Sequence, residues 1–368
     1  MDAGDALAME RMTLMTELER LCREVRPLDE GAMSRAKLRW DGIAKPLGSL
    51  GLLEEAVIRM AGLSGSEDVQ LSKRGVVVMC GDNGVVREGV TQTGQEVTAL
   101  VAGNIAKGRA SVCRMARLAR ADVYAVDMGM KVRAEGVIDR HIADGTANIA
   151  EGPAMTRKQA EEALLTGIEL VKSLKLRGYD ILATGEMGIG NTTTSSAVVS
   201  VLLSVGINEV TGRGAGLSDE GLIRKLSAIE RAIAVNCPDR EDAVDVLNKV
   251  AGFDIGGLAG VFIGGALYRV PVLIDGFISA ASALLASRIC PECVCAMFAS
   301  HISAEPASKL ILDALQLKPL ICAGMRLGEG TGAVCALPLF DMALSVYGEM
   351  PTFSDIGIEA YTPQGGLA

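Results

Sequence analysis

The feature that most constrains the fold is a repeated pattern in which a short apolar run ends at glycine with an acidic residue close by. Segments with the apolar spacing of helices separate these runs. The runs are Gly75–Met79, Asp122–Val126, Asp180–Ala183, Pro271–Ile274 and Pro319–Ala323. Strands that alternate with helices form a mainly parallel sheet with helices on both faces. We therefore expect an α/β, Rossmann-like fold.

The ends of the expected strands point to one candidate site. Ligands of open parallel sheets bind beyond the carboxyl ends of the strands. An acid after every run is more than chance placement would give, so we interpret this shared edge as an active site. The acids are Asp82, Asp127, Glu186, Asp275 and Glu329.

Apolar spacing also predicts the main helices. Thr156 and Gln159 form a capping box at the start of a helix that runs to Leu176. The helices before the first strand have no strand to cover, so we expect them to form a small helical bundle. Other helices are expected over residues 8–26, 52–63, 95–118, 218–235 and 240–250.

Charge and composition exclude several classes of protein. The chain has 36 basic and 45 acidic residues, a formal charge of −9, and no basic block, which argues against nucleic acid and anionic membranes as partners. The acidic N-terminus is not a signal peptide, and the most apolar region, Ile255–Cys290, is interrupted by polar residues and proline. We expect a cytoplasmic protein.

The cysteines fit the same compartment. Their number is nine, and most lie in apolar runs, which indicates reduced thiols. Cys290, Cys293 and Cys295 cluster, but a zinc site needs a fourth ligand, so we interpret them as core thiols and expect no metal.

Two glycine-rich loops are candidates for an anion site. Gly185–Thr194 leads into a helix, and backbone N–H groups at such a turn suit a phosphate. Its glycine order is not that of a dinucleotide fingerprint. Val210–Gly216 is the second loop, and Lys225 follows it at a position from which it either neutralises the same phosphate or lies exposed on a helix.

Glu329 and Glu186 are the candidate chemical groups. Glu329 stands between Gly328 and Gly330, where it acts as a base or caps the helix expected from Thr331. Glu186 pairs with it or only orders its own loop. The chain has two histidines, of which His301 is a plausible site residue and His141 looks like a surface residue.

Several of these stretches together resemble the nicotinate-nucleotide:dimethylbenzimidazole phosphoribosyltransferases. The matches extend from Lys45–Gly51 to Pro363–Gly366. The strongest are Gly-Glu-Met-Gly-Ile-Gly-Asn-Thr-Thr at Gly185–Thr193, Gly-Thr-Ala-Asn at Gly145–Asn148 and Leu-Gly-Glu-Gly-Thr-Gly-Ala at Leu327–Ala333.

The resemblance implies transfer of the 5-phosphoribosyl group from nicotinate mononucleotide to a lower-ligand base of cobalamin or a related cobamide. It implies no cofactor, a homodimer, and Glu329 as a general base that needs burial to accept a proton well. It further implies a large α/β domain of residues 71–332 and a small helical domain made from residues 1–70 and 333–368. Residues implied to hold substrates, with Glu186 as the second acid, are Gly188, Ile189, Gly190, Asn191, Thr192, Gly214, Lys225, Ser303, Leu327 and Gly328.

Two departures from the family pattern concern the acceptor. The family usually has histidine where this chain has Asn83, and often proline where it has Gly94, in the stretch that lines the acceptor pocket in relatives together with Asp82 and Gln95. The identity of the acceptor therefore stays open between a benzimidazole and a phenol or purine. Some relatives use a phenol or a purine, at times as one half of a heterodimer. A non-catalytic partner subunit and an NAD-dependent oxidoreductase are the competing hypotheses.

Overall fold

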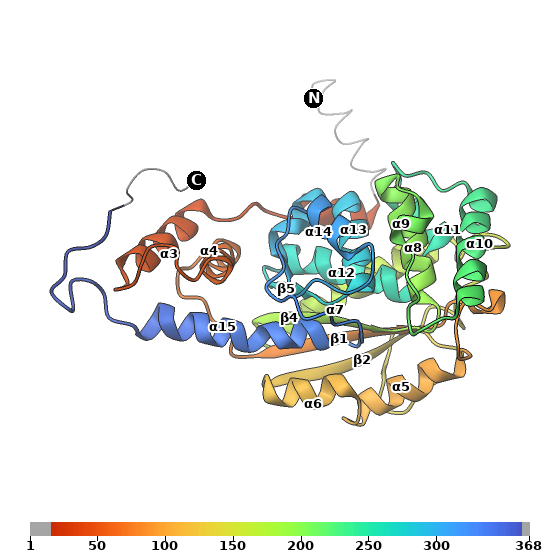
Figure 1. The fold of residues 1–368 in the computed structure, drawn as a ribbon, viewed down its shortest axis with the longest axis horizontal. Coiled ribbons are helices and arrows are strands. Elements are labelled where there is room, and N and C mark those ends of the chain that lie inside the picture. Colours follow the sequence, from red (N-terminus) through yellow and green to blue (C-terminus); the bar gives the residue numbers. More distant parts are fainter. Residues whose placement is uncertain (1–15, 363–368) are drawn as a thin grey trace, which may run out of the picture.

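A six-stranded parallel sheet forms the centre of the protein (Figure 1). The computed structural model describes residues 16–362. The strand order is β3-β2-β1-β4-β5-β6, and each neighbouring pair is parallel. The strands are β1 (Arg74–Gly81), β2 (Ala121–Gly129), β3 (Ile138–Asp139), β4 (Ile181–Met187), β5 (Val272–Ile274) and β6 (Met297–Ala299).

The order places a topological switch point between β1 and β4. From β1 the chain runs outward to β2 and β3, and then it crosses back to β4 on the other side of β1. Loops that leave two such strands diverge and open a crevice at their carboxyl ends. The Gly185–Thr194 loop starts at this crevice.

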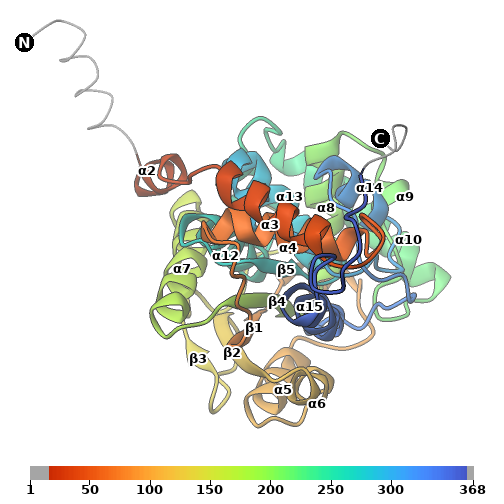
Figure 2. The same cartoon turned by 90° about the vertical axis from the view of Figure 1, so that its left-hand side faces the viewer.

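Helices cover both faces of the sheet (Figure 2). Alternate residues of β1 face opposite layers: Val76 and Val78 belong to one apolar core, and Val77 and Met79 to the other. One layer holds α5 (Glu96–Ala106), α6 (Ser111–Leu118) and α15 (Thr331–Glu349). The opposite layer holds α7 (Arg157–Leu176), α8 (Asn191–Leu203), α12 (Phe253–Leu267) and α13 (Phe277–Ile289).

The remaining helices lie outside these layers. Helix α2 (Glu17–Arg23) packs on α7 and α12. The others are α9 (Ile207–Val210), α10 (Asp219–Asn236), α11 (Ala243–Val250), α14 (Ser308–Ala314) and the 3-10 helices η1 (Gly84–Glu88) and η2 (Pro291–Ala296).

Segments from the two chain ends lie side by side. Helix α3 (Glu30–Gly42) packs on α4 (Leu52–Ser64), and α4 packs on α15. Ile43 also forms an antiparallel bridge with Thr352. Helix α15 therefore contacts β4 of the sheet and also the N-terminal helix α4.

The prediction of a strand over Pro319–Ala323 was wrong. Within this run only Ile321 pairs, through an isolated parallel bridge to His301. The N–H groups of Leu320 and Ile321 donate to the carbonyls of Ala299 and Ser300, at the end of β6, and the ladder does not continue. Two short strands were not predicted, β3 with two residues and β6 with three.

The predicted helices over residues 95–118 and 240–250 also needed correction. The first is interrupted after α5, where Gly108 has φ +70, and a separate α6 begins at Ser111. The second begins at Ala243, with Asp242 as its N-cap. The polar link before Ala44 contains the helix α3. Two further predictions lie outside the described residues: the N-terminal half of the helix expected over 8–26, and the motif at Pro363–Gly366.

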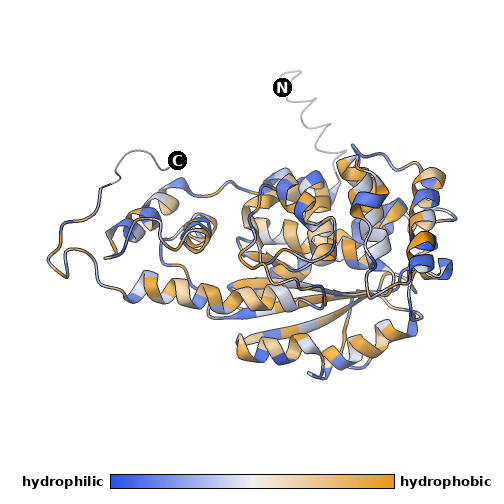
Figure 3. Ribbon diagram, viewed as in Figure 1, coloured by the Kyte–Doolittle hydropathy of each residue, from blue (hydrophilic) through white to orange (hydrophobic). Residues whose placement is uncertain are grey.

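Helix α15 is long and apolar enough to cross a membrane by length and composition alone, a feature that the sequence pattern did not single out (Figure 3). Half of its apolar window is buried inside the protein. Its Asp341 accepts a hydrogen bond of 3.0 Å from Arg74 at the start of β1. These contacts give the helix the environment of a core helix.

Candidate active site

A cavity of about 250 Å³ lies at the carboxyl edge of the sheet, beside β4 and β5. The sequence-predicted residues that line it come from four separate stretches of the chain. They are Glu186, Gly188, Ile189, Asn191, Thr192, Gly214, Ser303, Leu327, Gly328 and Glu329. The fold thus brings together most of the residues that the resemblance implied.

Five predicted residues do not line this cavity. Gly190 caps α8 behind it with φ +96, and Lys225 is fully buried beneath Thr192. Asp82 and Asn83 are buried next to the cavity, on the loop after β1. Gln95 donates to the Asn83 carbonyl at 2.8 Å.

The backbone around Glu329 has an unusual conformation. Gly328, Glu329 and Gly330 have φ values of +85, +62 and +95, so three consecutive residues are left-handed. This conformation is strained for glutamate, and such strain often accompanies a functional site. The Glu329 carbonyl also passes so close to β4 that a Cβ on Gly185 would lie 2.5 Å from it. Two glycine-rich stretches are therefore needed to place one glutamate.

The Glu329 side chain lies against the N-terminus of α6. Its Oε2 accepts a hydrogen bond of 3.2 Å from the backbone N–H of Val112, in the first turn of that helix. A helix N-terminus stabilises a nearby negative charge. The expected burial of Glu329 is wrong, since the residue is half-buried and reaches both solvent and the cavity.

The alternative in which Glu329 caps α15 is also wrong, because Asp275 does so instead. Its Oδ1 accepts from the N–H groups of Gly332 and Ala333 at 2.8 and 3.0 Å, and its Oδ2 accepts from Gly330 at 3.2 Å. Asp275 follows β5 directly and is buried. The end of β5 thus holds the turn that carries Glu329.

His301 packs on the same turn, as the sequence suggested for a site residue. It lines the cavity, and a Cβ on Gly332 would lie 2.0 Å from its Cε1. Burial lowers the pKa of His301, although the Asp275 carboxylate opposes that change. The neutral ring therefore serves as a wall of the cavity.

Glu186 belongs to a buried group of polar side chains. Its Oε2 accepts from Nδ2 of Asn191, and the same nitrogen donates to Oδ2 of Asp254 at 3.0 Å. Burial raises the pKa of Glu186 to about 8 and that of Asp254 to about 6. The two acids are buried and share one amide donor.

The two glycine-rich loops converge on Lys225. Its Nζ donates to Thr192 Oγ1 at 2.9 Å and to the Gly212 carbonyl at 3.0 Å. Gly214 has φ +54, and a Cβ there would lie 2.9 Å from Thr192 Oγ1. Burial lowers the pKa of Lys225 to about 8, which a bound anion would reverse. The exposed alternative for this lysine is therefore wrong.

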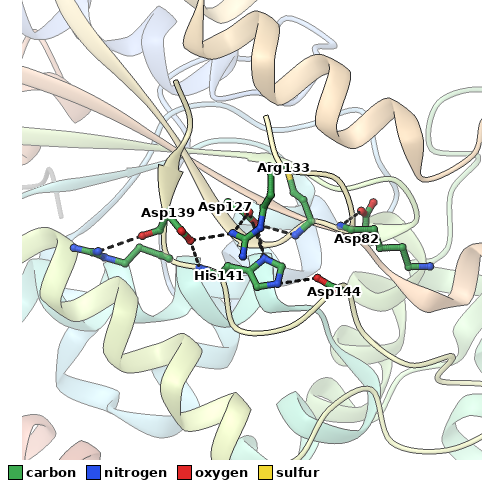
Figure 4. A network of polar contacts seen from close by, with 10 residues as sticks. Asp82, Asp127, Arg133, Asp139, His141 and Asp144 are labelled. Carbon is green, nitrogen blue, oxygen red and sulfur yellow. Dashed lines mark hydrogen bonds and ion pairs between the residues drawn. The ribbon is translucent and has the colours of Figure 1, made fainter. Parts of the chain in front are cut away.

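Asp127, at the end of β2, serves a different purpose (Figure 4). Its Oδ1 accepts from the N–H groups of Gly129 and Met130 at 2.9 and 2.8 Å, and its Oδ2 pairs with Arg133 at 2.9 Å. The His141 ring contacts Asp127 on one side and Asp144 on the other, at 3.3 and 3.0 Å, so it is not a plain surface residue. This network orders the loop after β2 rather than the cavity.

Sequence reasoning missed several cavity residues. Asp275 appeared only as one strand-end acid among five, with no role. Phe277 and Arg326 line the cavity, and neither belongs to a glycine-rich motif that would have drawn attention. The only signal for Arg326 was its position three residues before Glu329.

Comparisons with known proteins agree with this geometry. The phosphoribosyltransferase family model DBI_PRT matches residues 25–358. The nicotinate-nucleotide–dimethylbenzimidazole phosphoribosyltransferase of Ruminiclostridium cellulolyticum is 49% identical over 347 residues, which cover 94% of this chain and 99% of that protein. The enzyme of the same name from Acetivibrio thermocellus is 49% identical, over 90% of this chain and 95% of its own length.

A solved structure gives the same result for the fold. The crystal structure of CobT from Thermus thermophilus superimposes with a TM-score of 0.85 at 39% identity and covers 90% of this chain and all of the other. The expected α/β fold is confirmed, and so is the resemblance read from the glycine-rich motifs. This chain belongs to the nicotinate-nucleotide–dimethylbenzimidazole phosphoribosyltransferase family.

Proposed function

We propose that this chain catalyses the reaction for which its relatives are named. The 5-phosphoribosyl group of nicotinate mononucleotide moves to a nitrogen of dimethylbenzimidazole, which gives α-ribazole 5'-phosphate and nicotinate for cobalamin biosynthesis. The match over residues 25–358 supports this activity. The cavity geometry supports specific roles for its residues.

The observation that carries the assignment is that one cavity holds both a base and an anion site. Glu329 and Thr192 line the same space, and Lys225 lies directly behind Thr192. We assign the phosphate of the donor to the corner formed by Thr192, Gly214 and Lys225, because a helix N-terminus and a cation both stabilise a phosphate there. The acceptor base then lies toward Glu329.

The chemistry needs one base and no acid. The nicotinate ring of the donor is a positively charged pyridinium, so it departs with the electrons of the broken C–N bond as a neutral ring. The incoming ring nitrogen forms the new bond to the anomeric carbon. Glu329 takes the proton from the other ring nitrogen of the acceptor, which prevents a charged product. Attack opposite the leaving group converts the β-linked donor into an α-linked product.

The choice of acceptor is the finer part of the proposal. Asn83 is fully buried, and its Oδ1 lies 3.5 Å from Thr194 Oγ1 rather than in the cavity. We infer that the departure at this position leaves the cavity wall intact and that a benzimidazole remains the acceptor.

Product analysis tests both parts. The purified chain is incubated with nicotinate mononucleotide and, separately, dimethylbenzimidazole, adenine and phenol, and the products are identified by mass. We expect an α-ribazole phosphate from the benzimidazole at the highest rate. Nicotinate release only with a phenol or a purine would overturn the acceptor assignment, and no release with any acceptor would overturn the activity of the chain alone.

We also propose a cytoplasmic homodimer in which residues 1–70 and 333–368 act as a small helical domain beside the α/β domain of 71–332. Contacts of α4 with α15 support the pairing of the two chain ends, while α2 and the start of α15 pack on the α/β domain. Light scattering of the purified chain distinguishes a dimer from a monomer, and a requirement for a second protein would favour the heterodimer.

A further inference from the structure

Glu186 has surroundings that disfavour a negative charge. The residue is 8% exposed. The titratable groups that face it are Asp254 on α12, Asp275 after β5, Glu329 before α15 and Cys80 on β1. Among the described residues, the one polar side chain that it bonds is the neutral amide of Asn191. A buried carboxylate that meets like charges and no cation takes up a proton.

Asp254 is the better carrier of charge in this pair. It lies in the first turn of α12, where the helix N-terminus stabilises an anion, whereas Glu186 lies on a strand. Asn191 has two N–H groups on Nδ2 and gives one to each acid, so the amide joins the two without neutralising either. Among the described side chains, Asp254 Oδ1 has no hydrogen-bond partner. Charge on Asp254 in turn opposes charge on Glu186.

Glu186 nevertheless faces the cavity to which the proposed function assigns the substrates. It lines the cavity, and its Oε1 fills the space that a side chain on Gly328 would need, since a Cβ there would lie 2.4 Å from that oxygen. The free oxygen of Glu186 is thus the one beside the Glu329 turn. The donor nucleotide carries a phosphate and a carboxylate, and an ionised Glu186 would repel both.

We propose that Glu186 works as a neutral carboxylic acid that donates a hydrogen bond to an oxygen of the donor nucleotide, and that Asp254, acting through Asn191, keeps it protonated. This inference rests on the proposed phosphoribosyl transfer. Asp254 and Asn191 are then positioning residues, because they act on the substrate only through Glu186. Glu329 remains the single ionised carboxylate that meets the acceptor.

The pH dependence of kcat provides the test. Burial raises the pKa of Glu186 to about 8 in the free protein, and the negative charges of the donor raise it further, so kcat should fall at or above that pH as Glu186 loses its proton. Lys225 also has a pKa of about 8 in the free protein. A bound phosphate raises the pKa of Lys225, so its loss of charge affects kcat/KM rather than kcat, which reports the substrate complex.

Three variants separate the proposal from a purely structural role. Glu186→Gln keeps a neutral donor of the same shape, so we expect kcat at pH 7 to fall by about tenfold or less and the alkaline decline to disappear. Asp254→Asn removes a repelling charge, so the decline should move to lower pH. The double variant should again show no decline, because it has no carboxyl group at position 186 to titrate.

Two outcomes would overturn the inference. One is a Glu186→Gln variant as impaired at pH 7 as Glu186→Ala, which would mean that the charge of Glu186 is needed. The other is an alkaline decline that persists unchanged in Glu186→Gln. If nicotinate is still released in either case, the transferase activity stands and only the protonation assignment fails. Infrared difference spectra, in which the C=O stretch of a protonated carboxyl group is lost in Glu186→Gln, give a readout independent of turnover.

Discussion

Glu186 and Glu329 are two glutamates in the wall of one cavity with opposite surroundings. Glu186 is buried at the end of β4 among other acids, and within residues 16–362 its only side-chain hydrogen bond comes from the Asn191 amide. Glu329 is half-buried on a left-handed turn, and its carboxylate bonds the N-terminus of α6. The first environment disfavours a negative charge on Glu186, whereas the Glu329 side chain accepts a hydrogen bond at a helix N-terminus. Paired acids of the same type thus acquire different roles from the elements around them.

The largest effect should come from removing the ionised acid. Glu329→Gln keeps the size of the side chain but cannot take a proton from the acceptor, so we expect kcat to fall by about 10² to 10⁴-fold. The KM for nicotinate mononucleotide should change little. Steady-state kinetics measure both, with Glu349→Gln at the other end of α15 as the control. A near-normal kcat would remove the assignment of Glu329 as base.

The next effect concerns the anion corner. Lys225→Met removes the cation behind Thr192, and since hydrogen bonds to charged groups contribute about 1.5–3 kcal/mol, we expect the KM for the nucleotide to rise by about 10- to 100-fold. The value of kcat should change less. Lys309→Met, at an exposed position of α14, serves as the control. A fall in kcat alone would place the phosphate elsewhere.

A smaller effect should follow from loosening the turn that carries Glu329. Asp275→Asn leaves one acceptor oxygen where three N–H groups converge. We expect unfolding free energy to fall by about 1–3 kcal/mol and kcat to fall by about tenfold, because Glu329 is then less well positioned. Denaturant unfolding and kinetics provide the two measurements. Unchanged kcat in a destabilised protein would restrict Asp275 to capping α15.

The last effect is on the pH dependence of stability rather than on turnover. The folded chain keeps the Glu186 proton up to a pKa of about 8, while the ordinary pKa of a glutamate is 4.5, so between these limits the folded state binds more protons than the unfolded state. Stability therefore declines as pH rises through that window, by about 1.4 kcal/mol per pH unit at most. Glu186→Gln should lack this part of the decline. If the unfolding free energies of the unmodified protein and Glu186→Gln fell equally as pH rises, the raised pKa of Glu186 would be contradicted.

Local patterns in the sequence predicted the parts of the fold that depend on local residues. The β-branched run at Gly75–Met79 and the capping box at Thr156 each gave the right element. The three-residue β6 escaped because Ser300 and His301 follow it, whereas the equally short β5 is followed by Asp275 and Gly276, and the apolar run Pro319–Ala323 was taken in its place.

The site was predictable in composition but not in geometry. The glycine-rich motifs identified Glu186, Glu329 and the Thr192 loop, yet no local signal shows that Asp275 caps α15 or that α6 begins opposite Glu329. Both features are contacts between distant segments. The break at Gly108 matters here, because an uninterrupted helix over residues 95–118 would have left no free N–H group at Val112 for the Glu329 carboxylate.

The most direct test compares the two isosteric variants in one assay. Turnover of nicotinate mononucleotide with dimethylbenzimidazole is measured at pH 7 for Glu329→Gln and Glu186→Gln under the same conditions. We expect Glu329→Gln to be slower than Glu186→Gln by at least about tenfold, because only Glu329 acts as an ionised base. Equal losses in the two variants, or a greater loss in Glu186→Gln, would contradict the division of roles between the two acids.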